Sequence, residues 1–204
     1  MQSKRLNEIF GESIQAYYQH NDIKLAIPNP YPVESLDGLV FQKNWIDNRQ
    51  WNLEDLIRDR QRPPAEAIQF KWEIDRCNQE RTDTVETIDE LFFVQFGDVQ
   101  PETDAFLSTE TPAWAIDRLS ILHIKIYHMH QKLGNAENDR IFLKSQHRLQ
   151  ILLTQLEDLS QAIDQLFDNI YAGRCIVRTY KQMKMYNDPD FNPYLKNSEA
   201  KAES

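Results

Sequence analysis

The chain has 204 residues, of which 41% are hydrophobic and 27% are charged, and its formal net charge is −9. This composition is typical of a soluble globular protein, and the acidic excess argues against nucleic-acid binding, which requires lysine and arginine to neutralise phosphates. No apolar run reaches the roughly 20 residues that a membrane-spanning helix needs, so we expect no membrane insertion. The first residues also lack the apolar stretch of a signal peptide, which predicts a cytoplasmic protein.

Apolar residues recur at three- and four-residue steps along most of the chain, and only five glycines are present to form turns. Both features favour helices over a sheet. The prolines between residues 27 and 33 predict an extended connector after the first helix. In the first half of the chain, helices are expected at about residues 3–20, 35–59 and 62–96, and Ser35 is suited to cap the second of them.

The stretch from Thr111 to Leu133 carries apolar residues around nearly its whole circumference. A helix that is apolar on all sides belongs in the middle of a bundle. Thr111 is suited to cap this helix, Pro112 fits its first position, and Gly134 is suited to end it. After a polar loop at residues 97–110, we therefore expect the innermost helix of the fold here.

A long helix is predicted from about Ala136, and its apolar repeat continues beyond Gly173 to Met183, which predicts either a kink or close packing at Gly173. The Asn187–Pro193 segment then ends the helix. The sequence thus predicts an all-α, single-domain bundle of about five helices over residues 1–195, with a disordered tail at residues 196–204.

A strip of polar and aromatic residues follows one side of the second predicted helix. Asp47, Trp51, Glu54 and Arg58 are spaced so that they stack along one line of the helix surface. The strip is either a half-buried flank, with Glu54 and Arg58 as an ion pair, or the lining of a polar cleft.

Polar residues also interrupt the apolar lines of two other helices. Asn78 and Arg81 lie on the third helix, and Asp117 and Arg118 lie near the start of the central helix, where the helix amides favour an anion. Buried polar groups need partners, so we expect these residues to face the strip on the second helix. The sequence therefore predicts either one polar ligand-binding pocket inside the bundle or a structural network of ion pairs.

Four carboxylates on the second and third helices offer a metal site as an alternative. Glu80 and Asp83 are three positions apart, a spacing that can place both on one Mg²⁺ ion. Together with Glu54 and Asp55, they resemble the carboxylate sets of all-helical nucleotide pyrophosphohydrolases, which implies magnesium-dependent hydrolysis of a phosphoanhydride. The match is incomplete, because the residues three positions beyond Glu54 and Asp55 are isoleucine and arginine. Glu80 and Asp83 also share a polar face that is typical of a solvated surface.

Basic residues gather near the C-terminus. No acidic residue occurs between Gly173 and Asn187, whereas Arg174, Arg178 and Lys181 are spaced for one broad helical face. Such a face predicts an anion or phosphate site. The alternative is that it docks against the acidic helices of the same bundle.

Several motifs together resemble an uncharacterised bacterial family that is catalogued as domain of unknown function 4254. These motifs lie at residues 44–47, 51–55, 78–86, 111–120 and 180–189. The resemblance covers nearly the whole chain, and it implies a soluble single-domain bacterial protein with no assigned activity. It supplies no catalytic residue.

The polar residues are more typical of a structural network than of a reacting group, so we expect a non-catalytic binding or protein-interaction module without a cofactor. Its partner would be a small molecule or another protein, and a homo-oligomer is compatible with the sequence. The alternative is a magnesium-dependent hydrolase of a nucleotide or another phosphorylated substrate. The sequence leaves open whether the protein is an enzyme.

Overall fold

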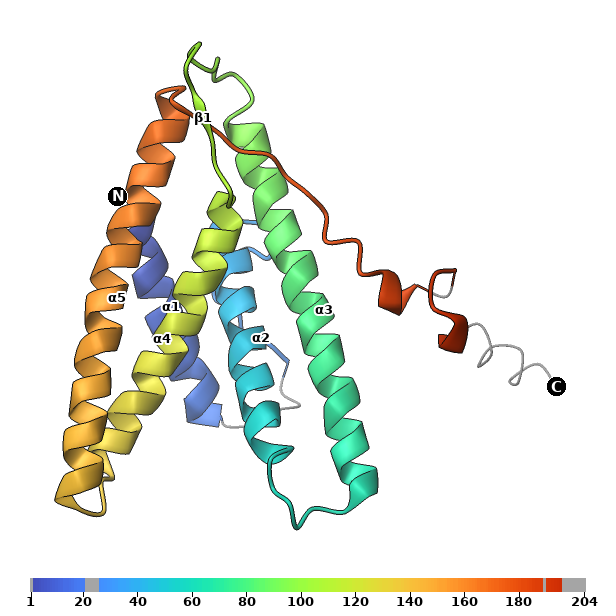
Figure 1. Ribbon diagram of the computed structural model, residues 1–204, viewed down its shortest axis with the longest axis vertical. Coiled ribbons are helices and arrows are strands. Elements are labelled where there is room, and N and C mark those ends of the chain that lie inside the picture. Colours follow the sequence, from blue (N-terminus) through green and yellow to red (C-terminus); the bar gives the residue numbers. More distant parts are fainter. Residues whose placement is uncertain (1, 21–25, 189, 196–204) are drawn as a thin grey trace.

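The helices of the protein follow the apolar repeats of the sequence closely. A computed structural model describes residues 2–20, 26–188 and 190–195. Within these residues the α-helices are α1 (Gln2–His20), α2 (Leu36–Leu56), α3 (Pro64–Gln95), α4 (Pro112–Gly134) and α5 (Asp139–Tyr171). The predicted all-α bundle is therefore confirmed (Figure 1). No helix among the described residues combines the length and the apolar character needed to cross a bilayer.

Side-chain caps set the starts of three helices. Ser35 Oγ accepts from the Gly38 amide at 3.0 Å at the start of α2, and Thr111 Oγ1 accepts from the Trp114 amide at 3.3 Å at the start of α4. Asn138 Oδ1 does the same for α5, at 3.0 Å from the amide nitrogen of Ile141. Each cap satisfies an amide that has no partner within its own helix. The predicted caps of α2 and α4 are confirmed.

The expectation that α4 is innermost is right for only part of the helix. In Figure 1, α4 crosses in front of α1, between α5 and α2, and it contacts all four other α-helices. Its first half is largely buried, but Arg118, Lys125 and Lys132 are exposed along one flank. The most enclosed stretch is instead residues 38–48 of α2, in which only Gln42 is not fully buried. The prediction failed because it took the helix that is apolar on all sides to be the innermost one, whereas α2 is enclosed although it carries polar residues.

The prediction that the last helix continues beyond Gly173 is wrong. The α5 helix ends at Tyr171, and Gly173 adopts a left-handed conformation with φ of +74°. A β-carbon at this position would lie 2.5 Å from the carbonyl oxygen of Gln100, so only glycine fits. The chain then forms β2 (Cys175–Ile176), which pairs in parallel with β1 (Phe106–Leu107).

Beyond β2 the chain runs as an extended arm along α3, with one short 3₁₀ helix, η1 (Met185–Asn187) (Figure 1). Lys184 Nζ donates to Thr82 Oγ1 at 2.7 Å, and the Gln182 amide donates to Glu86 Oε1 at 3.0 Å. Lys181 Nζ lies 3.6 Å from Glu90 Oε1. The arm therefore docks on acidic α3, as the second interpretation of the basic segment anticipated. The predicted disordered tail, at residues 196–204, lies outside the described residues.

Candidate functional site

Buried charged side chains join α2, α3 and α4 in the interior of the bundle. Lys43 is fully buried, and its ammonium group donates to Asp47 Oδ2 at 2.5 Å and lies 2.7 Å from Asp117 Oδ1. Arg81 donates to the Asp117 carboxylate through Nε at 2.7 Å and through Nη2 at 2.5 Å. Ser120 Oγ donates to Asp47 Oδ2 at 2.6 Å. We call these five residues the buried charge network.

The network balances two cations against two anions. Burial raises the pKa of Asp47, although the charge of Lys43 opposes this effect. Burial acts on Asp117 in the same direction, but the hydrogen bonds from Arg81 and the charge of Lys43 outweigh it and hold the pKa of Asp117 below its usual value. A buried ion is stable only when its partners compensate for the lost hydration. Each of the four charges therefore depends on the others.

Two asparagines extend the network along α2. Asn44 Nδ2 donates to Ser120 Oγ at 2.9 Å, and Asn48 Nδ2 donates to Asn44 Oδ1 at 3.0 Å. The Oδ1 atom of Asn48 is buried without a hydrogen-bond partner among the described residues. The polar side of α2 is thus used to hold α4, and only its edge reaches the surface.

A cleft of about 270 Å³ opens at this edge, between α2, α3 and α4. The side chain of Arg81 is 22% exposed here, and its Nη1 atom makes no hydrogen bond to any residue that the structure describes. Arg58 Nη1 lies 2.7 Å from Glu54 Oε2 at the mouth. We call this cavity the Trp51 cleft; it is lined by Asp47, Gln50, Trp51, Glu54, Asp55, Arg58, Arg81, Ile121 and Ile124.

The Trp51 ring is held in place by aromatic neighbours. It stacks on the imidazole of His128, with ring centroids 4.8 Å apart and planes inclined by 13°. His128 Nε2 lies 2.8 Å from the hydroxyl oxygen of Tyr18 on α1. Burial lowers the pKa of His128, although Asp55 opposes this effect, so the imidazole is neutral at pH 7. A flat aromatic surface is therefore fixed at the cleft.

A second cavity, of about 500 Å³, adjoins the cleft and lies between α2, α4 and α5. Its lining is mostly apolar but contains Lys125, Lys132 and Arg148, none of which pairs with an acidic residue in the described part of the chain. We call this cavity the basic hollow. Its lining residues are Trp51, Asp55, Lys125, His128, Met129, Lys132, Arg148, Ile151 and Leu152.

The chain matches the profile of one known protein family. The profile of a family described as a protein of unknown function (DUF4254) matches residues 37–179, which is most of the sequence. The chain belongs to this family. Neither a curated protein nor a solved structure matches it. The DUF4254 segment runs from the start of α2 to just beyond β2 and contains the whole buried charge network, whereas α1 and the motif at residues 180–189 lie outside it.

The DUF4254 structure separates the residues predicted to share one polar pocket. Asp117 lies behind the cleft, bound to Arg81. Arg118 points elsewhere, because its side chain is 62% exposed and pairs with Glu110 at 2.9 Å. Asn78 is not part of the lining, and its carbonyl oxygen accepts from Lys184 Nζ at 3.1 Å. The predicted residues that do line the cleft are Asp47, Trp51, Glu54, Arg58 and Arg81.

The carboxylates of the alternative metal site do not gather around one point. Glu80 pairs with Arg49, and Asp83 is exposed and accepts from Gln79 Nε2 at 2.7 Å. The two carboxylates contributed by α2 line the Trp51 cleft instead. Across the described ranges, no group of three or more histidine, cysteine, aspartate or glutamate side chains is arranged to hold a metal ion.

The basic segment after α5 does not present one helical face. Arg174 Nε donates to Asn169 Oδ1 at 2.9 Å, Arg178 is exposed, and Lys181 lies near Glu90 on α3. The predicted face required a helix, and the left-handed turn at Gly173 removes that helix. The three cations therefore do not converge on a common anion.

Sequence reasoning missed Lys43 and the cations of the basic hollow. Lys43 lies four residues before Asp47, a spacing at which a lysine and an aspartate on one helix meet, so the pair was visible in the sequence. Lys125 and Lys132 are seven residues apart on α4, which places them on one flank. Arg148 comes from α5, and only the packing of α5 against α4 brings it to the same cavity.

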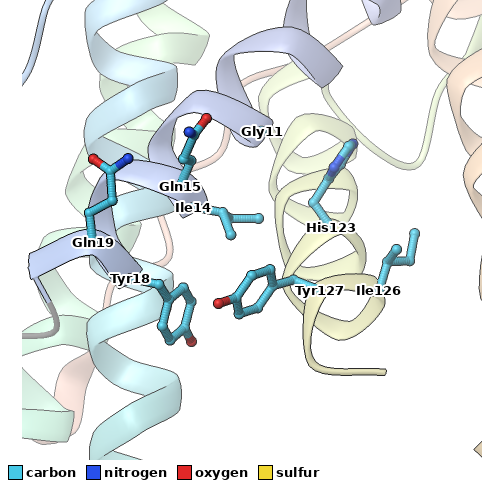
Figure 2. Close-up of a pocket in the computed structure, with 8 residues that line it drawn as sticks. All are labelled: Gly11, Ile14, Gln15, Tyr18, Gln19, His123, Ile126 and Tyr127. Atoms are coloured by element: carbon cyan, nitrogen blue, oxygen red, sulfur yellow. The ribbon is translucent and has the colours of Figure 1, made fainter. Parts of the chain in front are cut away.

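A further groove, of about 450 Å³, lies between α1 and α4 of the DUF4254 protein. Figure 2 shows the rings of Tyr18 and Tyr127 side by side at one end and His123 farther along α4. The two tyrosine rings are stacked, with centroids 4.4 Å apart. Burial lowers the pKa of His123 to about 4, and its Nε2 atom lies 2.9 Å from Asn7 Oδ1. Gly11 forms part of the α1 wall.

We expect Gly11→Ala to raise the free energy of unfolding by about 0.5–1 kcal/mol, because alanine favours a helix interior over the unfolded chain. A β-carbon at Gly11 would meet no atom within 4 Å. Gly38→Ala is the control: its β-carbon would collide with the carbonyl oxygen of Pro32, so this variant should lose stability. Urea unfolding measures both, and a loss of stability in Gly11→Ala would contradict the open groove.

Proposed function

We propose that the protein is a non-catalytic binding module and that its ligand is a small organic anion with a planar or apolar part, bound in the Trp51 cleft. The observation that carries this proposal is the position of Arg81. Two of its guanidinium nitrogens are fixed on a buried aspartate, and Nη1 forms no hydrogen bond to a described residue. The Arg81 side chain lines the cleft.

A preorganised guanidinium is well suited to bind an acidic group. Arg81 loses little conformational freedom on binding, because Asp117 already holds its side chain at 2.7 Å and 2.5 Å. Charge-assisted hydrogen bonds from arginine to carboxylate or phosphate are among the stronger polar contacts. The acidic group of the ligand is therefore assigned to Arg81.

Trp51 and its neighbours suit the rest of such a ligand. The fixed indole offers apolar area and a surface for stacking, and Ile121 and Ile124 add apolar area from α4. Gln50 and Asp55 line the same cleft and make no hydrogen bond through their side chains to a described residue. They are therefore available to polar groups of the ligand.

A binding role fits the cleft better than catalysis, because the groups that could transfer protons are already engaged. Asp47 accepts from Lys43 and Ser120, and Glu54 pairs with Arg58. A general acid or base needs a free site within hydrogen-bond reach of the substrate. Asp55 alone does not supply the nucleophile and base of a hydrolytic site.

The proposal is tested by thermal shift and calorimetry with benzoate, phenyl phosphate and adenosine monophosphate, each with and without magnesium. A ligand that binds only the folded state raises the melting temperature. We expect Arg81→Lys to weaken the best of these ligands by about tenfold, because lysine lacks the second arm of the guanidinium. Arg118→Lys makes the same change at an exposed arginine and should leave the affinity unchanged. No shift with any anion, or a shift that requires magnesium, would overturn the proposal.

A further inference from the structure

We infer that the basic hollow is a second binding site, which takes a single-chain amphiphilic anion such as an alkyl phosphate or an alkyl carboxylate. The alkyl chain of the ligand would lie on the apolar floor of the hollow, and its acidic head would lie against the lysine and arginine side chains at the rim. The hollow shares Trp51 and Asp55 with the Trp51 cleft. The inference nevertheless does not rest on the proposed function, because Arg81 does not line the hollow and the three cations of the hollow do not line the cleft.

The floor supplies apolar surface from three helices. Trp51 comes from α2, Met129 from α4, and Ile151 and Leu152 from α5. Ile151 is 45% exposed, so a branched apolar side chain remains in contact with water here. Covering such surface with an alkyl chain is favourable in proportion to the apolar area removed from water.

The rim supplies positive charge that the protein leaves uncompensated. Lys125, Lys132 and Arg148 form no ion pair with a described residue, and Asp55 is the one acidic residue in the lining. Lys125 and Lys132 are two helical turns apart, about 10 Å along α4, so they flank the floor on one side. Long basic side chains commonly lay their methylenes on an apolar surface and keep the charge at its edge.

The surrounding sequence shows the same segregation of charge. Residues 118–156 contain six lysine or arginine residues and two acidic residues, in a chain with a net charge of −9. This region therefore attracts anions to a protein that otherwise repels them. The charge favours anionic amphiphiles over cationic ones.

The shape of the site favours a single amphiphile molecule over a flat membrane surface. Three helices wall the cavity, and its volume of about 500 Å³ is typical of small-molecule sites. We therefore assign the site to a monomeric amphiphile.

Calorimetry with decyl phosphate below its micelle concentration tests the assignment on the full chain. We expect binding, and we expect the Lys132→Gln/Arg148→Gln variant to weaken it about tenfold, since both substituted side chains line the hollow. The control is Arg140→Gln/Lys144→Gln, which removes the same charge near the turn between α4 and α5. Both of these residues are exposed and lie outside the lining of the hollow, so the affinity should change by less than about threefold. Equal weakening in the two variants would mean a diffuse electrostatic effect and would overturn the site.

The dependence of affinity on the length of the alkyl chain, and the comparison of dissolved ligand with vesicles, provide further readouts. Affinity should rise roughly fourfold per methylene from ethyl to hexyl phosphate, and inorganic phosphate should not bind. Failure of decyl phosphate to bind, or binding only to phosphatidylglycerol vesicles, would contradict a monomer site.

Discussion

Asp117→Ala is expected to lower the free energy of unfolding by about 3–5 kcal/mol, the usual cost of breaking a buried ion pair from one side. The substitution removes the carboxylate that both Lys43 and Arg81 contact, at 2.7 Å in each case. Asp47 would then face the buried Lys43 and the partly buried Arg81 without the second carboxylate. Leaving a charge buried without a partner costs far more than losing a hydrogen bond on the surface.

Urea unfolding followed by circular dichroism measures this loss, and Glu110→Ala is the matched control. Glu110 also pairs with an arginine, at 2.9 Å, but that arginine side chain is 62% exposed. An exposed ion pair contributes about 0–1 kcal/mol. If the two alanine variants lost similar stability, the network would not hold the helices together as described.

Stability should fall as the pH is lowered from about 6.5 to about 4, and His123 should account for about 3 kcal/mol of this fall. Burial lowers the pKa of His123 to about 4, whereas an unfolded histidine has a pKa near 6.5. Between these values the unfolded chain binds the proton more readily than the folded one, so acid favours unfolding. The contribution is fully present above pH 6.5 and is lost as the pH falls to 4.

The His123→Gln variant isolates this contribution. Glutamine can still donate a hydrogen bond to Asn7 Oδ1, as the imidazole nitrogen at 2.9 Å is placed to do, but it does not titrate. Denaturant unfolding of both proteins at pH 7 and pH 4.5 should therefore give a smaller loss for the variant. His128, whose pKa burial also lowers, remains in both proteins and cancels in the comparison. Identical pH dependence of the two proteins would contradict the assignment.

The fold was predictable where local signals agreed with packing. Caps at Ser35 and Thr111 and unbroken apolar repeats predicted α1 to α4 to within a few residues at most ends. The segment after Gly173 failed because its apolar spacing also suits a helix. Its actual form depends on the close approach of Gly173 to Gln100 and on pairing with β1, and neither contact between distant residues is visible in local periodicity.

The candidate site was predictable where one helix presents all the residues. Helical spacing correctly placed Asp47, Trp51, Glu54 and Arg58 on one line, and that line borders a cleft. Arg118 was misplaced, because one residue along a helix turns the side chain by about 100° and takes it from the interior to the solvent. The position of Arg148 depends on the packing of α5 against α4, which spacing within one helix does not specify.

The buried charge network has a consequence for how the nascent chain acquires its structure. Its charges come from α2, α3 and α4, so an emerging chain that has reached α3 holds Lys43, Asp47 and Arg81 but lacks Asp117. A hairpin of α2 and α3 would then enclose an excess positive charge, which opposes its premature closure. We therefore expect these helices to consolidate together once α4 has left the ribosome, rather than one after another.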